Sequence, residues 1–219
     1  MDDLITVYRR AWDRKSVELF TMDTFLFKPE VIAEKFGDRN INVTIGHIKR
    51  TKDKEYRNFK KRDELPIAEL FDAGYLAIDI DDLYGDQKEI DRLVKLFEAD
   101  PNCYAVKGTP SGNLVAFYKF DCSEEDFPKL YYKLYLELTL KLSCNIDYLP
   151  DARRLRYLSN GEIYHYNEQS GIVTEMMEMD EVPIIKKVKP KTEEIEVTEG
   201  GTKIRRTKRI YLAGSFNHD

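Results

Sequence analysis

Residues 74–83 read GYLAIDIDDL, and this stretch decides the fold class that the sequence predicts. Its leucine and two isoleucines alternate with other residues, so they fall on one face of a strand, where successive side chains point to opposite faces. Asp79 and Asp81 share the other face, together with Tyr75 and Ala77. The pattern predicts a strand that is buried on one side and carries two carboxylates at its end.

The residues that follow predict a helix, a hairpin and a second helix. Asp86, with Glu89 three residues on, is typical of a helix start, and apolar residues recur at helical spacing up to Asp100-Pro101. Strands are predicted at 103–107 and 114–120 on either side of the turn Thr109-Pro110-Ser111-Gly112-Asn113. The second helix begins near Asp126-Phe127-Pro128 and carries a leucine stripe.

A fourth strand is predicted at 152–159, ARRLRYLS, which completes the order strand-helix-strand-strand-helix-strand. This β-α-β-β-α-β unit belongs to the α+β class and underlies RNA-recognition and ferredoxin-like folds. We expect residues 1–40 to form an N-terminal extension packing on the core, with a short helix at 29–36. Residues 41–179 form the main domain, and the charged residues 180–219 form a tail or a hairpin around Gly200-Gly201.

Composition excludes several classes of protein. Of the 219 residues 42% are hydrophobic and 12% aromatic, which is ordinary for a folded domain, and the net charge of −5 argues against a wholly basic surface. The three cysteines show no CxxC spacing, so reduced thiols are expected rather than a disulfide framework or a zinc site. The chain has no apolar run of about 20 residues, so we expect a cytoplasmic protein that does not enter a membrane.

Topology predicts that three separate segments meet. A right-handed crossover makes the first two strands parallel, so the hairpin turn and the start of an antiparallel fourth strand lie at the end where the first strand finishes. Asp147 would therefore join Asp79 and Asp81 as a third carboxylate. Hard cations such as Mg²⁺ or Mn²⁺ suit such a cluster, and a two-metal site would activate a hydroxyl and stabilise leaving pyrophosphate.

Arginine, serine and glycine residues at the same sheet end are suited to binding phosphate. Arg154 and Arg156 should face the aspartates from the fourth strand and hold triphosphate or template backbone. Ser111, Gly112 and the backbone N–H groups of the turn could cradle phosphate oxygens. A basic stretch with interleaved aromatic residues at 47–65 is a further candidate for nucleic-acid binding; its candidate residues are Lys49, Arg50, Arg57, Lys60, Lys61 and Arg62.

Each feature also has a plain structural interpretation. The acidic string can be a strand running into a turn, with Arg154 as a salt-bridge partner, and Asp147 can simply cap an element. The Ser-Gly turn can be an ordinary hairpin turn, and the arginines can lie on an exposed strand face. Residues 47–65 can be a solvated helix or loop.

The chain resembles the archaeo-eukaryotic primase superfamily, and within it the primase-like N-terminal domain that precedes VirE-type ATPases in Bacteroides proteins and phages. The motifs that carry the resemblance span roughly residues 40–170; they are RDELP (62–66), GYLAIDIDDL (74–83), ADP (99–101), TPSG (109–112) and NIDYLPDARRLRYLS (145–159). The resemblance implies metal ligands at Asp79, Asp81 and Asp147 and phosphate handling by Ser111-Gly112. Asp151 and Arg154 match the D-x-x-R run of the family.

The resemblance implies a template-dependent nucleotidyltransferase of phage or mobile-element replication. Its partners would be single-stranded DNA and nucleoside triphosphates. No P-loop is present, so a replicative helicase partner would be a separate chain or a missing C-terminal part. Family members place a His or Lys shortly after the Ser-Gly turn, whereas this chain has Asn113-Leu114-Val115-Ala116. An RNA-recognition-like binding module with a vestigial acidic site therefore stays open, although the expected open sheet face offers one aromatic, Tyr75. A nucleotidyltransferase of another kind or a nuclease is the third alternative.

Overall fold

The computed structural model describes residues 4–10, 13–37, 41–44, 74–123, 126–150, 156–178, 191–199 and 202–210. The chain forms two compact units, Met1–Val182 and Pro183–Asp219. The smaller unit contains β11 (Lys191–Glu199) and β12 (Thr202–Ile210), which pair antiparallel. All other elements belong to the larger unit.

The fold is α+β, with a main sheet of six strands. These strands are β4 (Tyr75–Ile80), β5 (Cys103–Gly108), β6 (Leu114–Phe120), β7 (Ile146–Asp147), β9 (Ile163–Tyr166) and β10 (Ile172–Val173). Their order is β7-β4-β6-β5-β9 with antiparallel neighbours, and β10 pairs in parallel with the end of β6. Since β4 and β5 both run antiparallel to β6, they are parallel to each other, as the crossover argument predicted.

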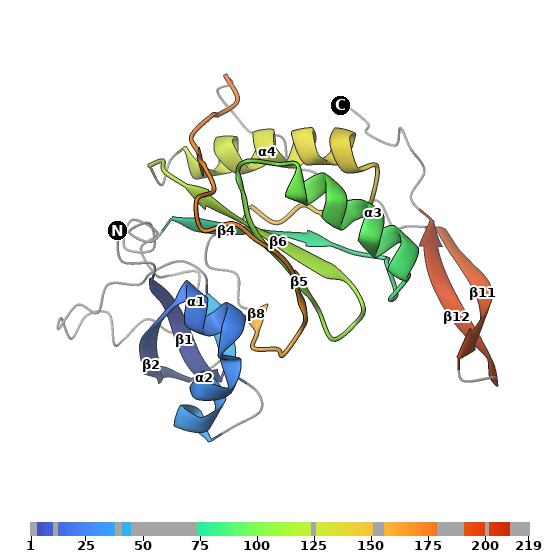
Figure 1. The fold of residues 1–219 in the computed structure, drawn as a ribbon, viewed down its shortest axis with the longest axis horizontal. Coiled ribbons are helices and arrows are strands. Elements are labelled where there is room, and N and C mark those ends of the chain that lie inside the picture. Colours follow the sequence, from blue (N-terminus) through green and yellow to red (C-terminus); the bar gives the residue numbers. More distant parts are fainter. Residues whose placement is uncertain are drawn as a thin grey trace. The chain divides into compact units, whose positions relative to one another are not determined.

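Two helices cover one face of this sheet, α3 (Gln87–Glu98) and α4 (Phe127–Leu142) (Figure 1). Both lie where the apolar spacing predicted them. Pro128 stands in the first turn of α4, where its missing N–H has no intrahelical partner to lose. Within the described residues, no helix is long and apolar enough to cross a membrane.

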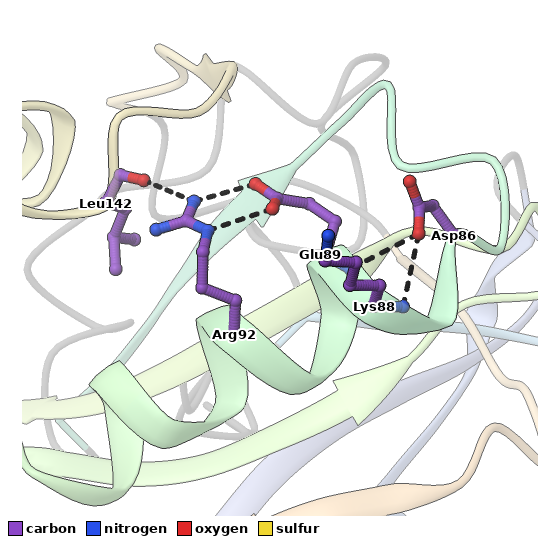
Figure 2. A network of polar contacts seen from close by, with 5 residues as sticks. All are labelled: Asp86, Lys88, Glu89, Arg92 and Leu142. Carbon is purple, nitrogen blue, oxygen red and sulfur yellow. Dashed lines mark hydrogen bonds and ion pairs between the residues drawn. The ribbon is translucent and has the colours of Figure 1, made fainter.

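Side chains at the start of α3 fix the helix and tie it to α4. Asp86 caps it by accepting the N–H groups of Lys88 and Glu89 at 3.1 and 3.3 Å. In a capping box the Glu89 side chain would accept the backbone N–H of Asp86. Here it accepts two hydrogen bonds from Arg92 instead. Arg92 also donates to the Leu142 carbonyl at the end of α4, at 2.7 Å (Figure 2).

A second sheet lies in the same unit, with strand order β2-β1-β3-β8. It is made of β1 (Leu4–Arg10), β2 (Asp13–Thr21), β3 (Asn42–Thr44) and β8 (Arg156–Tyr157). Two short helices, α1 (Met22–Phe27) and α2 (Pro29–Phe36), follow β2, and α2 occupies the predicted range. We call this sheet with its two helices the N-terminal layer.

The N-terminal layer and the main sheet share one hydrophobic core. Ile5, Phe25 and Ile32 of the layer belong to the same buried cluster as Tyr75 and Phe117 of the sheet. The rings of Phe25 and Phe117 pack edge to face, with centroids 5.9 Å apart. The layer therefore buries the sheet face opposite α3 and α4.

This burial corrects the expectation of an open sheet face. Tyr75 is 2% exposed and Ala77 5%, because the N-terminal layer packs on them. Tyrosine and alanine side chains can be buried, so β4 can be covered on both faces. The alternation of these residues with leucine and isoleucine does not show whether the second face is open or covered.

The predicted fourth strand at 152–159 is also corrected. The strand that pairs with β4 is β7, at residues 146–147, whereas β8, at 156–157, pairs with β3 of the N-terminal layer. Both strands have two residues, which is too short for a period-two pattern to separate one partner from another.

Candidate functional site

Two carboxylates oppose each other at one edge of the main sheet. In the register of β7 against β4, Asp147 lies directly opposite Asp79. Directly opposed side chains of an antiparallel pair share a face, and their Cβ atoms are about 4.5–5.5 Å apart. Like charges in that position repel, so a cation nearby stabilises the pair.

Asp81 extends β4 by one residue and is held by two asparagines. Its N–H donates to the Asn145 carbonyl at 3.0 Å, and the Asn113 amide donates to its carboxylate at 3.1 Å. The Asn113 side-chain oxygen also accepts the Leu83 N–H at 3.1 Å. Asn113 therefore joins the hairpin turn to the acidic segment, and three segments far apart in sequence meet at one sheet end.

Arg156 forms an ion pair with Asp79. Its Nη1 donates to Asp79 Oδ1, and its Nη2 donates to the Ala77 carbonyl at 3.4 Å. The two side chains are 14% and 17% exposed, so solvent screens the pair little. Arg156 thus reaches the aspartate from β8 of the N-terminal layer rather than from the main sheet, where it was predicted.

Two buried donors beside this ion pair have no acceptor among the described residues, Arg156 Nε and the Tyr131 hydroxyl. Tyr131 lies on α4 and is 2% exposed. Burial raises the pKa of its hydroxyl; Arg156 and the backbone N–H of Leu149 lower it, and the carboxylates of Asp79 and Asp147 raise it. The phenol is therefore protonated and within electrostatic range of both aspartates.

The hairpin turn is built around Gly112. Its φ is 77°, and a Cβ atom there would lie 2.6 Å from the Gly85 nitrogen, which donates to the Gly112 carbonyl at 2.9 Å. The N–H groups of Gly112 and Asn113 both donate to Thr109. Those two groups serve the turn itself, whereas the exposed Ser111 hydroxyl, 2.9 Å from the Thr109 hydroxyl, remains accessible to a ligand.

Lys107 is a buried charge at this site that sequence analysis missed. It lies opposite Val115, which lies opposite Asp79, so one row of the sheet carries Asp147, Asp79, Val115 and Lys107 on a single face. Two strand spacings separate the Cα atoms of Lys107 and Asp79 by about 10 Å. Its Nζ donates to the Phe25 carbonyl at 3.2 Å, and the side chain is 1% exposed. A lysine at the end of an apolar strand gives no sign of such burial in the sequence.

The described residues contain no group of three or more His, Cys, Asp or Glu side chains placed to hold a metal ion. The site with Asp79, Asp81 and Asp147 as ligands therefore stays a prediction. Its donor chemistry fits Mg²⁺ or Mn²⁺, which prefer carboxylate oxygens. The Arg156 guanidinium also places a positive charge beside Asp79, where it reduces the repulsion between the opposed carboxylates.

Several predicted residues lie outside the described part of the chain. They are Asp151, Arg154 and the whole basic set, Lys49, Arg50, Arg57, Lys60, Lys61 and Arg62. Their roles stay predictions.

The fold and the site define an α+β protein with an opposed carboxylate pair, a paired arginine and a serine-bearing turn at one sheet end. No family model matches the chain, and neither does any curated protein or solved structure.

Proposed function

We propose that this chain carries out metal-dependent nucleotidyl transfer of the primase–polymerase kind, in phage or mobile-element DNA replication in the cytoplasm of a bacterial host. The observation that carries the proposal is the in-register opposition of Asp79 and Asp147 beside Asp81. Carboxylates gathered at a strand end next to a turn with an accessible hydroxyl suit a metal-bound triphosphate.

The arrangement of the main sheet supports the same proposal. Elements β4, α3, β5, β6, α4 and β7 follow one another, and their strands lie in the order β7-β4-β6-β5. We interpret this order as the β-α-β-β-α-β unit of RNA-recognition and ferredoxin-like folds. It is also the architecture that the resemblance to primases implies.

In this proposal Asp79 and Asp147 hold Mg²⁺ or Mn²⁺, with Asp81 beside them. The bound ions would make the attacking hydroxyl more acidic and stabilise the leaving pyrophosphate. Asn113 keeps the Asp81 carboxylate oriented. The Ser111 hydroxyl donates to a phosphate oxygen, and the positive charge of Arg156 offsets the charge of the triphosphate.

The proposed substrates are nucleoside triphosphates and a single-stranded DNA template. The basic residues at 49–62 would contact the template backbone, which makes binding depend on salt. A replicative helicase on a separate chain would be the functional partner.

The test is incorporation of labelled nucleotide on single-stranded DNA with Mn²⁺ or Mg²⁺. Asp147→Asn should lower the rate by at least about a hundredfold, because it removes a charged ligand without changing the shape of the side chain. Asp91→Asn is the matched control, since Asp91 is exposed on α3 and bonded to Gln87, and it should leave the rate unchanged. No incorporation by the parent protein with either metal, or full activity of Asp147→Asn, would refute the proposal.

One observation favours a second candidate, a binding module without catalysis. Arg156 already neutralises Asp79, and no complete set of metal ligands stands ready in the described residues. Such a module could not use the main sheet as an RNA-recognition surface, because the N-terminal layer covers it. Binding of single-stranded DNA without nucleotide incorporation would favour this candidate.

A further inference from the structure

We propose that Arg156 is an internal counter-ion of the acidic site and that a divalent cation must displace it from Asp79 to bind. The inference rests on the metal site of the proposed function and concerns how that site is controlled. The ion pair occupies Oδ1 of Asp79, one of the two oxygens of the carboxylate that the proposed metal site uses. A metal ion bound to the same carboxylate would stand close to the guanidinium, and two positive charges in a poorly screened site repel each other.

The opposed carboxylates explain why a counter-ion is present. Asp79 and Asp147 repel each other across β4 and β7, and Asp79 is 17% exposed, so water compensates little of the charge. Arg156 supplies part of that compensation in the metal-free protein. A divalent cation held by the two carboxylates would supply more of it.

The hydrogen bonds of Arg156 are incomplete, which suits a residue that is released. Its Nε is buried without a partner among the described residues, and its bond to the Ala77 carbonyl is long at 3.4 Å. Arg92 shows a better satisfied arginine, with two bonds to Glu89 and one to the Leu142 carbonyl, all between 2.7 and 2.8 Å (Figure 2).

The Tyr131 hydroxyl is a second, independent sign of a ligand at this place. It is 98% buried within range of both carboxylates; the backbone N–H of Leu149 approaches its oxygen, but its own proton has no acceptor among the described residues. Such a group costs stability unless something at the site satisfies it. A hydrated metal ion on Asp79 and Asp147 brings water molecules that can accept its proton.

The backbone of Arg156 does not need to move for this exchange. Arg156 lies opposite Val43 in the pairing of β8 with β3, and Val43 is fully buried in the core of the N-terminal layer. Only the side chain has to leave Asp79. Metal entry therefore frees a guanidinium beside the carboxylates, where it can meet the phosphate groups of a substrate.

The test is Mn²⁺ affinity, measured by calorimetry on the full chain. Arg156→Gln should bind Mn²⁺ about tenfold or more tightly than the parent protein, because the competing charge is gone. Arg92→Gln is the matched control and should not change the affinity, since Arg92 pairs with Glu89 on α3. Adding Asp79→Asn to Arg156→Gln should remove the gain.

A second variant guards against misfolding of Arg156→Gln, and circular dichroism checks both. Arg156→Lys keeps the charge but loses the planar fork, so its affinity should fall between those of the parent protein and Arg156→Gln. Equal or weaker Mn²⁺ binding by the folded Arg156 variants overturns the inference, and so does the absence of Mn²⁺ binding in every protein. If the variants bind as expected but no nucleotide is ever incorporated, the inference stands and the proposed polymerase function fails.

Discussion

At the scale of single residues, Lys107 is a charged side chain buried within the described structure. It is enclosed between β5 and α1, with its Nζ bonded to the Phe25 carbonyl and 4.7 Å from the centre of the Phe25 ring. Burial lowers the pKa of Lys107 from 10.5 to about 8. Its carbonyl bond and ring contact offset part of that penalty, since both favour the charged form.

This lowered pKa predicts a pH-dependent stability difference. Below pH 8 the lysine is charged in the folded and unfolded states, so the full cost of burial is present. Between pH 8 and 10.5 Lys107 loses its proton in the folded protein but keeps it in the unfolded protein. The contribution of Lys107 to the free energy of unfolding therefore becomes more favourable by roughly 3 kcal/mol. Urea unfolding should therefore show the parent protein gaining stability relative to Lys107→Met over this interval.

The parent protein must be compared with Lys107→Met because other groups also change the free energy of unfolding in this pH interval. Burial raises the pKa of several tyrosines and cysteines, Tyr118 and Cys103 among them, and their ionisation in the unfolded state lowers stability in the same pH interval. They titrate alike in both proteins and cancel. A stability difference that does not change with pH would show that Lys107 is not held at a lowered pKa.

At the scale of elements, the contact between the hairpin turn and the loop after β4 sets the geometry of the acidic segment. Gly112 must approach Gly85 closely, and the neighbouring Asn113 then reaches both Asp81 and Leu83. A side chain at Gly112 would push these two segments apart. Gly112 therefore has a packing role whether or not the turn also binds phosphate.

Gly112→Ala should destabilise the protein by about 2–4 kcal/mol, because it adds a steric clash to an unfavourable backbone conformation. Gly37→Ala is the control: Gly37 has a similar φ of 62°, but no atom lies within 4 Å of the added Cβ. It should cost about 1 kcal/mol, the price of the left-handed conformation alone. Equal losses in urea unfolding of the two variants would argue against the close approach.

At the scale of the whole larger unit, the N-terminal layer is part of the core and not an appendage. Several contacts hold α1 to the main sheet, among them Lys107 on the Phe25 carbonyl, Tyr104 on Asp23 at 2.9 Å, and the Phe25 ring on Phe117. Any nucleic acid must therefore bind at the sheet edge or on other surfaces, because the sheet face is filled.

Phe25→Ala should lower the free energy of unfolding by about 3–5 kcal/mol, because Phe25 is 3% exposed and the truncation leaves a cavity between the layer and the sheet. Phe27→Ala, on the same helix, should cost about 1 kcal/mol or less, since Phe27 is 44% exposed. Urea unfolding followed by circular dichroism should show one transition for both. A separate early transition in Phe25→Ala would mean that the layer unfolds independently.

The sequence by itself determined the elements whose patterns are local. The ranges of α2, β4 and β6 match their predictions, and α3 and α4 begin at the predicted residues, because helical and alternating periodicities and caps are written in neighbouring positions. The crossover argument also placed Asp147 at the sheet end of Asp79, but through a predicted strand at 152–159, whereas the strand that pairs with β4 is β7.

Tertiary structure alone decided the rest. The two-residue strands β7 and β8 are too short to carry a period, so only packing assigns Asp147 to the main sheet and Arg156 to the N-terminal layer. The same packing buries Lys107, covers Tyr75 and aims Arg156 at Asp79. These are contacts between residues far apart along the chain, and their energies depend on burial and charge that no local pattern encodes.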